Sequence, residues 1–213
     1  MVHQVTASLA PAADPKIQDH GSAASAHSDD ARLVARIADH DADALTRVIG
    51  DRFALVFAVA RRMVGNDADA EDIAQEVFLR LWRKPPDLSL GTARLPTWLY
   101  RVTANLSIDW LRRKRPQPLD DALDSPSDDP APDAATAEGQ VSRSVDKALA
   151  VLPERQRLAM TLTYYQGLSN IEAASIMEIS VDALESLLSR ARRNLRQELQ
   201  DDWRDLLDAI EFS

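Results

Sequence analysis

Clustered arginine and lysine side chains are the residues of this sequence whose type and spacing best suit a chemical task, namely contact with nucleic acid phosphate. One unbroken run comprises Arg112, Arg113, Lys114 and Arg115. A second group comprises Arg190, Arg192, Arg193 and Arg196. Local clusters of this kind set the attraction for phosphate, whatever the net charge of the chain. The first run has an alternative explanation, because cations also complement the C-terminal end of a helix dipole.

A polar stripe lies on the segment 70–83. One face of the expected helix carries Asp72, Gln75, Glu76, Leu79 and Arg83 at helical steps. Another face carries Ala70, Ile73, Ala74, Val77 and Leu81, and is expected to be buried. By spacing alone, an ordinary solvent-exposed face is the simpler interpretation of the polar stripe.

No catalytic or metal-binding pattern accompanies these residues. The four histidines are His3, His20, His27 and His40, and three of them fall in the N-terminal extension. The absence of Cys excludes a disulfide framework and thiolate zinc sites in this sequence. No nucleophile–base pair, glycine-rich phosphate loop or His–Glu metal spacing is found. We therefore expect no enzymatic activity, no cofactor and no metal.

The composition predicts an all-α fold. Hydrophobic residues make up 45% of the 213 residues, aromatic residues only 5%, and there are 6 glycines. Two small helical domains are predicted, over 29–115 and 143–213. A flexible acidic linker over 116–142 joins them, and a disordered extension over 1–28 precedes them.

The net charge of −9 is concentrated outside the cores of the predicted domains. Residues 116–142 hold 7 acidic residues and no basic residue, whereas residues 29–115 hold 15 basic against 13 acidic residues. No apolar run approaches the roughly 18–20 residues that a membrane span requires. With no signal-peptide pattern either, the sequence predicts a cytoplasmic protein without direct membrane insertion.

Caps and breakers predict the helix ends in the first domain. A dense apolar helix over 53–64 is expected to stop at Gly65, and Asp67 or Asp69 to cap the next helix. That helix should run to about Lys84, before two prolines. Pro96 is expected in the first turn of a helix that extends to about residue 115.

The second domain has the spacing of a helix-turn-helix, after a helix expected from Pro153 to about residue 166. Ser169 and Glu172 form a capping box for a short helix, and Ser180 caps a long helix to about residue 199 or beyond. The predicted apolar faces are Ile171, Ala174, Ile176 and Met177, then Val181, Leu184, Leu188, Ala191 and Leu195. DNA binding is the favoured interpretation; a plain helical hairpin with a solvated arginine face is the alternative.

Three segments resemble bacterial RNA polymerase sigma factors of the extracytoplasmic-function (ECF) group. LPERQRLAMTLTYYQGLSNIEAASIMEIS, from Leu152, with ALESLLSRARRNLR after it, is similar to the domain that reads the promoter −35 element. DAEDIAQEVFLRLW, from Asp69, is similar to the segment that docks on the polymerase β′ clamp helices. PTWLYRVTANLSIDWLRRKR, from Pro96, is similar to the −10 recognition and melting segment. The resemblance covers about residues 29–199.

The resemblance implies functional residues in each segment. Contacts with core polymerase are implied for Asp72, Gln75, Glu76 and Leu79. Contacts with the −10 element are implied for Arg101, Asn105, Arg112, Arg113, Lys114 and Arg115, with Asn105 facing a flipped base. Contacts with the −35 element are implied for Ser180, Asp182, Glu185, Ser186, Ser189, Arg190, Arg192 and Arg193. Glu185 and Leu187 stand where the family commonly has basic residues, and Glu178 lies where glycine often forms the turn.

The implied function is that of a dissociable initiation factor. It would bind core RNA polymerase through the β′ clamp and the β flap, direct it to promoter DNA and promote strand opening. An anti-sigma factor is implied as its inhibitor, and we expect Leu187 and the apolar groups between residues 181 and 188 to contact it. The alternative is a stand-alone helix-turn-helix regulator whose N-terminal domain binds an effector or dimerises.

Overall fold

The computed structural model describes residues 20–88, 94–114 and 147–211, with side-chain packing over 28–88, 94–114 and 147–197. Within these ranges every regular element is helical, which confirms the all-α prediction. The elements are α1 (His20–Ala38), α2 (Ala42–Val64), α3 (Asp67–Arg83), α4 (Leu95–Lys114), α6 (Glu154–Met160), the π-helix η1 (Thr161–Tyr165), α7 (Asn170–Met177) and α8 (Val181–Glu211). None of the described helices is long and apolar enough to cross a membrane.

One predicted boundary is wrong. Helix α1 begins at His20, so the prediction of a disordered extension fails over 20–28. This segment has no apolar period but contains three Ala residues, whose high helix propensity the pattern of hydrophobicity does not register. Helix α8 runs to Glu211, in line with the expectation that it ends at about residue 199 or beyond. The rest of the predicted extension and the whole predicted linker lie outside the described residues.

Helices α1–α4 form the first unit, with α2 packed on both α3 and α4. Its core includes Ile37, Val59, Met63, Leu81 and Leu99, all fully buried. The predicted apolar face of α3 is confirmed, since each of its five residues is buried.

The cap of α3 differs from the prediction. Asn66, rather than Asp67 or Asp69, caps the helix: its side chain accepts a hydrogen bond from the backbone N–H of Asp69 at 2.9 Å. Gly65 ends α2 in the left-handed region, at φ 89°. The chain therefore turns from α2 to α3 over two residues, which leaves Asp67 inside the first helical turn.

Helices α6–α8 and η1 form the second unit. The predicted capping box is confirmed: Ser169 Oγ accepts from the Glu172 N–H at 3.3 Å, and the Ser169 N–H donates to Glu172 Oε2 at 2.9 Å. Ser180 caps α8, because its hydroxyl oxygen accepts from the N–H of Ala183 at 3.2 Å. The helix expected from Pro153 is divided into α6 and the π-helix η1. Ile171 is 73% exposed, and Ala173 is buried instead, which corrects the predicted apolar face of α7.

Replacing Ser169 with Ala should lower the free energy of unfolding by about 1 kcal/mol, because the Glu172 N–H loses its acceptor and the Glu172 carboxylate loses the hydroxyl donor of Ser169. Urea denaturation followed by circular dichroism measures this loss. Ser175→Ala is the matched control, since this exposed serine lies inside the same helix and Ala favours the helical state there. Equal stability of the two variants would contradict the role of the cap.

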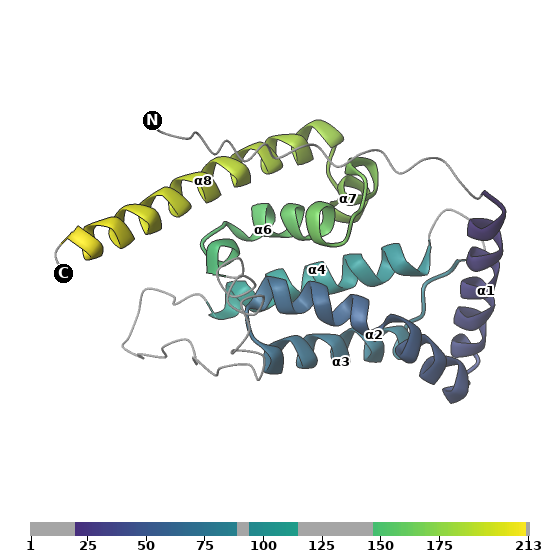
Figure 1. Ribbon diagram of the computed structural model, residues 1–213. Helices are drawn as coiled ribbons and strands as arrows, with labels where there is room; N and C mark the ends of the chain where they lie inside the picture. Colours follow the sequence, from purple (N-terminus) through teal and green to yellow (C-terminus); the bar gives the residue numbers. More distant parts are fainter. Residues whose placement is uncertain (1–19, 89–93, 115–146, 212–213) are drawn as a thin grey trace.

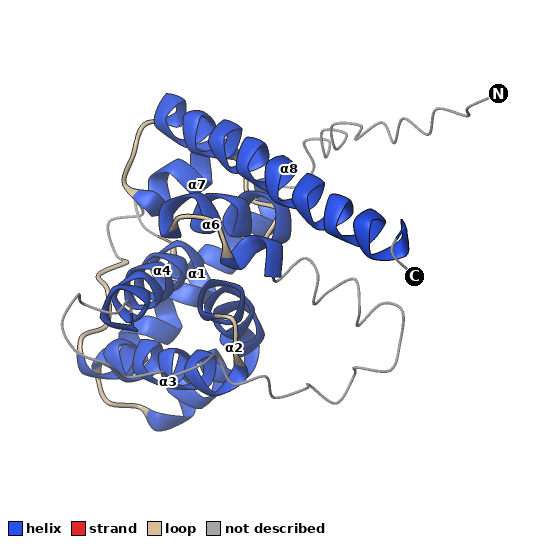
Figure 2. Cartoon of the chain, turned by 90° about the vertical axis from the view of Figure 1, so that its left-hand side faces the viewer, coloured by secondary structure: helices blue, strands red, loops and turns tan. Residues whose placement is uncertain are grey.

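The two units pack directly on each other, with α4 lying between α2 and α3 on one side and α6 and α7 on the other (Figures 1 and 2). Arg157 joins them. Its Nη1 donates to the carbonyl oxygen of Met63 at 2.6 Å, and its Nη2 donates to the carbonyl oxygens of Ala150 and Leu152. The side chain is buried, and this burial lowers the pKa of Arg157. The carbonyl of Met63 belongs to the last turn of α2, where backbone acceptors lack helical partners.

Two aromatic contacts extend this interface. The guanidinium of Arg62 on α2 lies 3.6 Å from the ring centroid of Tyr165 on η1. The hydroxyl of Tyr100 on α4 donates to Gln166 Oε1 at 3.2 Å. Burial raises the pKa of Tyr100, and the nearby charge of Glu172 raises it further. The two predicted domains are therefore joined by side-chain contacts as well as by the chain.

Candidate polymerase and nucleic-acid interfaces

The outer face of α3 brings together the four residues predicted to bind core polymerase. Asp72 and Gln75 are exposed, Leu79 is 44% exposed, and Glu76 is half-buried. Glu76 also accepts a hydrogen bond from Arg80 Nε at 2.9 Å, which orders its carboxylate. The opposite face of the helix is buried, so the backbone that carries these side chains is held in place. An exposed leucine among ordered polar groups on a rigid helix suits contact with another protein.

Phe53 adds an aromatic surface beside α3 that the sequence reasoning missed. It is 39% exposed, and its ring lies 5.7 Å from that of Phe57 and 6.5 Å from that of Phe78, centroid to centroid. Phe78 is itself buried on α3. Phe53 therefore connects the outer surface of α2 to the helix that carries the predicted polymerase contacts. The dense apolar run from residue 53 did not indicate this exposure, because every Phe in such a run is predicted to be buried.

The residues predicted to contact the −10 element lie along α4. Asn105 and the cations Arg112, Arg113 and Lys114 are exposed, whereas Arg115 lies outside the described residues. Lys114 Nζ lies 3.2 Å from Asp69 Oδ2 and 4.3 Å from the ring centroid of Trp110. Arg112 Nε lies 3.7 Å from Glu154 Oε2. Part of this cationic run is thus paired within the protein, through weak surface contacts that phosphate can replace.

Arg101 also lies on α4, but its side chain contacts the second unit. Its Nη2 donates to the carbonyl oxygen of Ser175 at 2.9 Å, and its Nη1 lies 3.2 Å from Glu178 Oε1. Both partners belong to the helix-turn-helix, at the end of α7. The structure therefore places one predicted −10 residue against the unit that carries the predicted −35 residues.

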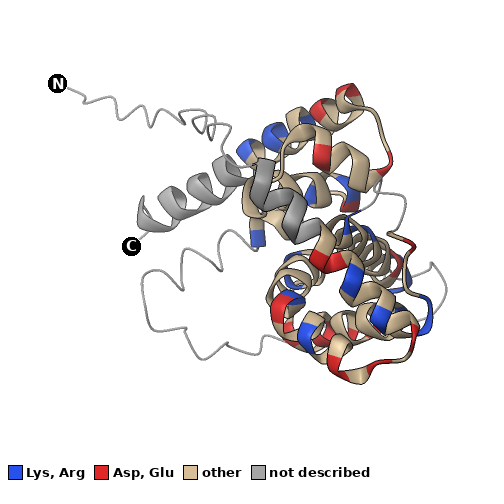
Figure 3. Cartoon of the chain, turned by 90° about the vertical axis from the view of Figure 1, so that its right-hand side faces the viewer, with Lys and Arg blue, Asp and Glu red and all other residues tan. Residues whose placement is uncertain are grey.

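All eight residues predicted to contact the −35 element lie on α8 or at its cap, and all are exposed. They are Ser180, Asp182, Glu185, Ser186, Ser189, Arg190, Arg192 and Arg193. Acidic residues occupy the first turns of α8 and basic residues the following turns (Figure 3). Glu185 lies within 3.4 Å of Asn170 Nδ2, and Arg192 Nε donates to the carbonyl oxygen of Leu188 at 3.2 Å. The start of this face carries hydrogen-bonding side chains of the types that suit base edges, and the following turns carry cations of the type that suits phosphate.

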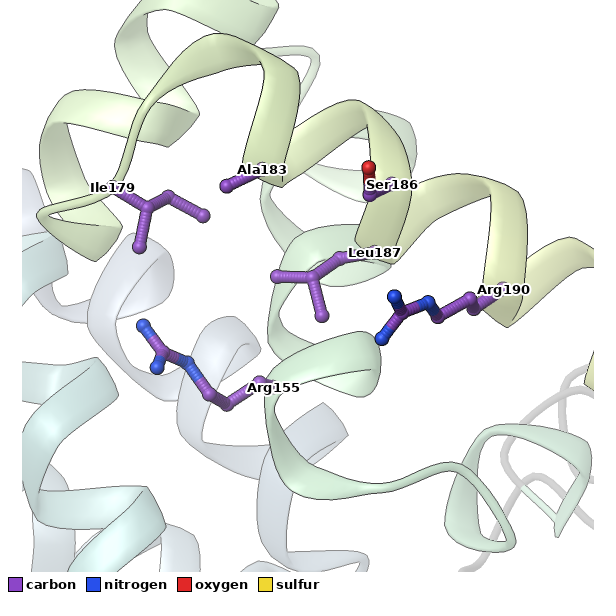
Figure 4. Close-up of a pocket in the computed structure, with 6 residues that line it drawn as sticks. All are labelled: Arg155, Ile179, Ala183, Ser186, Leu187 and Arg190. Atoms are coloured by element: carbon purple, nitrogen blue, oxygen red, sulfur yellow. The ribbon is translucent and has the colours of Figure 1, made fainter.

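A groove of about 360 Å³ lies between α6 and α8. Its apolar part is formed by Ile179, Ala183 and Leu187, and Arg155 and Arg190 stand at its sides (Figure 4). Leu187 points into this space from α8, and Ser186 and Arg190 of the predicted −35 face line the same groove. The groove therefore offers apolar contact flanked by positive charge.

Known families and relatives match both units. The model of Sigma-70 region 2 matches residues 51–117, and that of Sigma-70, region 4 matches residues 142–195. The ECF RNA polymerase sigma factor SigL of Mycobacterium tuberculosis is 31% identical over 164 residues, which are 74% of this chain and 90% of the relative. The chain belongs to the ECF RNA polymerase sigma factors.

Other relatives agree with this family. SigW of Bacillus subtilis is 29% identical over 181 residues, covering 80% of this chain and 96% of that ECF sigma factor. Among solved structures, CnrH in complex with the cytosolic domain of CnrY has a TM-score of 0.61 at 23% identity, covering 82% of this chain and 99% of CnrH. That structural likeness shows that the helices of this ECF factor follow a known fold.

The two family matches correspond to the two packed units of this ECF factor. The region 2 match includes α3 and α4, and the region 4 match contains α6, α7 and the first half of α8. Region 2 therefore holds the outer face of α3 and the cationic end of α4. Region 4 holds the exposed face of α8 and the groove beside it.

Proposed function

We propose that this ECF factor is a dissociable transcription initiation factor of the cytoplasm. It binds core RNA polymerase through α3, reads the −10 element through α4 and the −35 element through α8, and promotes strand opening. The observation that carries the proposal is the outer face of α3, where Leu79 is 44% exposed beside Asp72 and Gln75 while the opposite face is buried. The alternative, a stand-alone helix-turn-helix regulator, does not by itself explain this face.

The side chains on α4 and α8 support the roles proposed for these two helices. The exposed amide of Asn105 lies on the same helix as the cationic end of α4, so one helix offers both base-edge and phosphate contacts. The start of α8 presents the carboxylate of Glu185, which accepts a hydrogen bond from the amino group of cytosine. Phosphodiester bond formation belongs to the polymerase, and this chain supplies positioning only.

Run-off transcription with purified core polymerase on genomic DNA fragments tests the proposal. Discrete start sites that require the protein are the expected result, and their upstream sequences reveal the promoter elements. Protection of duplex DNA by the protein alone, without any discrete start, would instead identify a helix-turn-helix regulator.

We further propose that an anti-sigma factor inhibits the protein by inserting an amphipathic helix into the groove beside α8. The groove combines apolar side chains with Arg155 and Arg190, so it suits a helix that carries apolar and acidic residues. In support, the sigma factor RpoE of Bartonella quintana, a protein of similar fold, has been solved in complex with the anti-sigma factor NepR.

Leu187→Ala should weaken binding of the cognate anti-sigma factor by about 1 to 2 kcal/mol, because the variant removes apolar contact at the centre of the groove. A double-mutant cycle between Leu187 and the apolar residues of the inhibitor measures this coupling. A coupling energy of zero would rule out Leu187 as a contact.

A further inference from the structure

Helix α4 contacts the second unit through residues that we also propose to bind promoter DNA. Arg101 on α4 donates to the carbonyl oxygen of Ser175 and pairs with Glu178, both at the end of α7. Arg112, further along α4, lies 3.7 Å from Glu154 on α6. Two of the cations needed for promoter DNA are thus occupied by carboxylates of region 4.

This arrangement conflicts with simultaneous binding of the two promoter elements. Positions −10 and −35 are 25 base pairs apart by definition, and at 3.4 Å per step they lie about 85 Å apart along a duplex. In the structure, α4 and α7 are in direct contact, with Arg101 Nη1 only 3.2 Å from Glu178 Oε1. The two units must therefore separate before both elements are read.

The chain is long enough to permit that separation. Lys114 and Lys147 are the described residues on either side of the junction, and 32 residues lie between them. A connection of this length spans at most about 115 Å when extended. Closed and open arrangements are therefore both compatible with the covalent chain.

Glu178 has an unusual backbone for its residue type. It ends α7 in the left-handed region at φ 54°, where glycine is favoured and a side chain is strained. Its backbone N–H satisfies carbonyl groups of α7, as a glycine at this position also would. What glutamate adds is a carboxylate aimed at Arg101. Strain kept at such a position points to a task for the side chain.

We propose that Glu178 is an intramolecular latch that holds regions 2 and 4 together in the free protein and keeps Arg101 from promoter DNA. The inference rests on the proposed function, since it assigns to Arg101 a role in binding DNA. Other contacts between the units, among them those of Arg157, Arg62 and Tyr100, hold the closed state alongside the latch. Opening exchanges the ion pairs of Arg101 and Arg112 for contacts with phosphate.

Single-molecule energy transfer in the full-length chain tests the latch. The sequence has no Cys, so Asp51→Cys on α2 and Gln197→Cys on α8 give two unique labelling positions, both exposed. Glu178→Gln should raise the ratio of open to closed molecules about two- to fivefold, because this is the change expected from the loss of one half-exposed ion pair. Glu178→Gly should raise it at least as much without destabilising α7, because glycine adopts this backbone freely.

Two further variants sharpen the result. Asp29→Asn is the matched control, because Asp29 has the same 67% side-chain exposure as Glu178 and pairs with Arg32 within α1. It should leave the ratio unchanged. Arg101→Glu combined with Glu178→Arg should restore the closed population. An identical ratio in wild type and Glu178→Gln overturns the latch.

Run-off transcription with limiting protein then separates the latch from the function. Glu178→Gln should raise the initial rate about two- to fivefold, in step with the open population. An unchanged rate despite more open molecules overturns inhibition by the latch. If neither protein starts transcription but the populations shift, the initiation role is overturned while the contact between Glu178 and Arg101 is supported.

Discussion

The variant Gln75→Ala/Glu76→Ala/Leu79→Ala should bind core RNA polymerase roughly 1000-fold more weakly than the wild type. Residues at the centre of an interface commonly contribute 2 kcal/mol or more each, and their effects are not additive, so about 4 kcal/mol is expected for the three. Leu79 is expected to dominate, because it is the most exposed large apolar side chain on α3. The variant should fold normally, since the three side chains face outward and Ala favours helix.

Binding of the full-length protein to purified core polymerase, measured by fluorescence anisotropy, checks this expectation. Asp29→Ala/Arg32→Ala is the control, because it removes an exposed ion pair from α1, away from the proposed interface. Thermal unfolding of all three proteins shows whether the substitutions leave the fold intact. Affinity within about threefold of wild type for the triple variant would reassign the outer face of α3.

The sequence predicted α3 well because its pattern is local. Ala70, Ile73, Ala74, Val77 and Leu81 repeat at helical steps, and the structure buries all five. The capping box at Ser169 was equally clear, since both hydrogen bonds join residues three apart in the sequence. Short-range chemistry of this kind needs no knowledge of the rest of the fold.

Helix ends were harder to predict where neighbouring residues compete for one role. Asn66, Asp67 and Asp69 all suit a cap, and only the left-handed turn at Gly65 decides in favour of Asn66. Ile171 matched an apolar spacing, yet it is 73% exposed, and Ala173 is buried. Residue type alone therefore did not identify the buried face of a helix of eight residues.

Contacts between the two units were beyond sequence reasoning. Arg157 and Met63 are 94 residues apart, and Arg101 and Ser175 are 74 residues apart. No periodicity connects such pairs, and a buried arginine that binds backbone carbonyl groups looks in the sequence like any exposed one. The π-helix η1 was also hidden, although its residues Tyr165 and the following Gln166 supply part of the interface. Consequently the candidate surfaces were predictable, but their mutual contact was not.

Arg190→Ala/Arg193→Ala should weaken binding of the polymerase complex to promoter DNA by about 3 kcal/mol, more than 100-fold, at low salt. Both side chains are exposed on α8, beyond the start that we propose reads bases, and we expect them to contact phosphate groups. A hydrogen bond between charged groups contributes about 1.5 kcal/mol or more, and two are lost. Each lost contact also lowers the slope of log affinity against log salt by about 0.9, so the slope should fall by nearly two.

Titrations over a series of salt concentrations, with the promoter and with an unrelated duplex, measure both quantities. The double variant should lose affinity for both duplexes, because phosphate contacts carry no sequence information. Glu185→Ala is the contrasting variant: it should leave the salt slope unchanged and relax the preference at one base pair, at a cost of about 1 to 3 kcal/mol. Arg47→Ala, on an exposed position of α2, controls for the loss of positive charge. An unchanged slope in the double variant would place phosphate recognition elsewhere on region 4, with Arg192 and Arg196 as the next cations along α8.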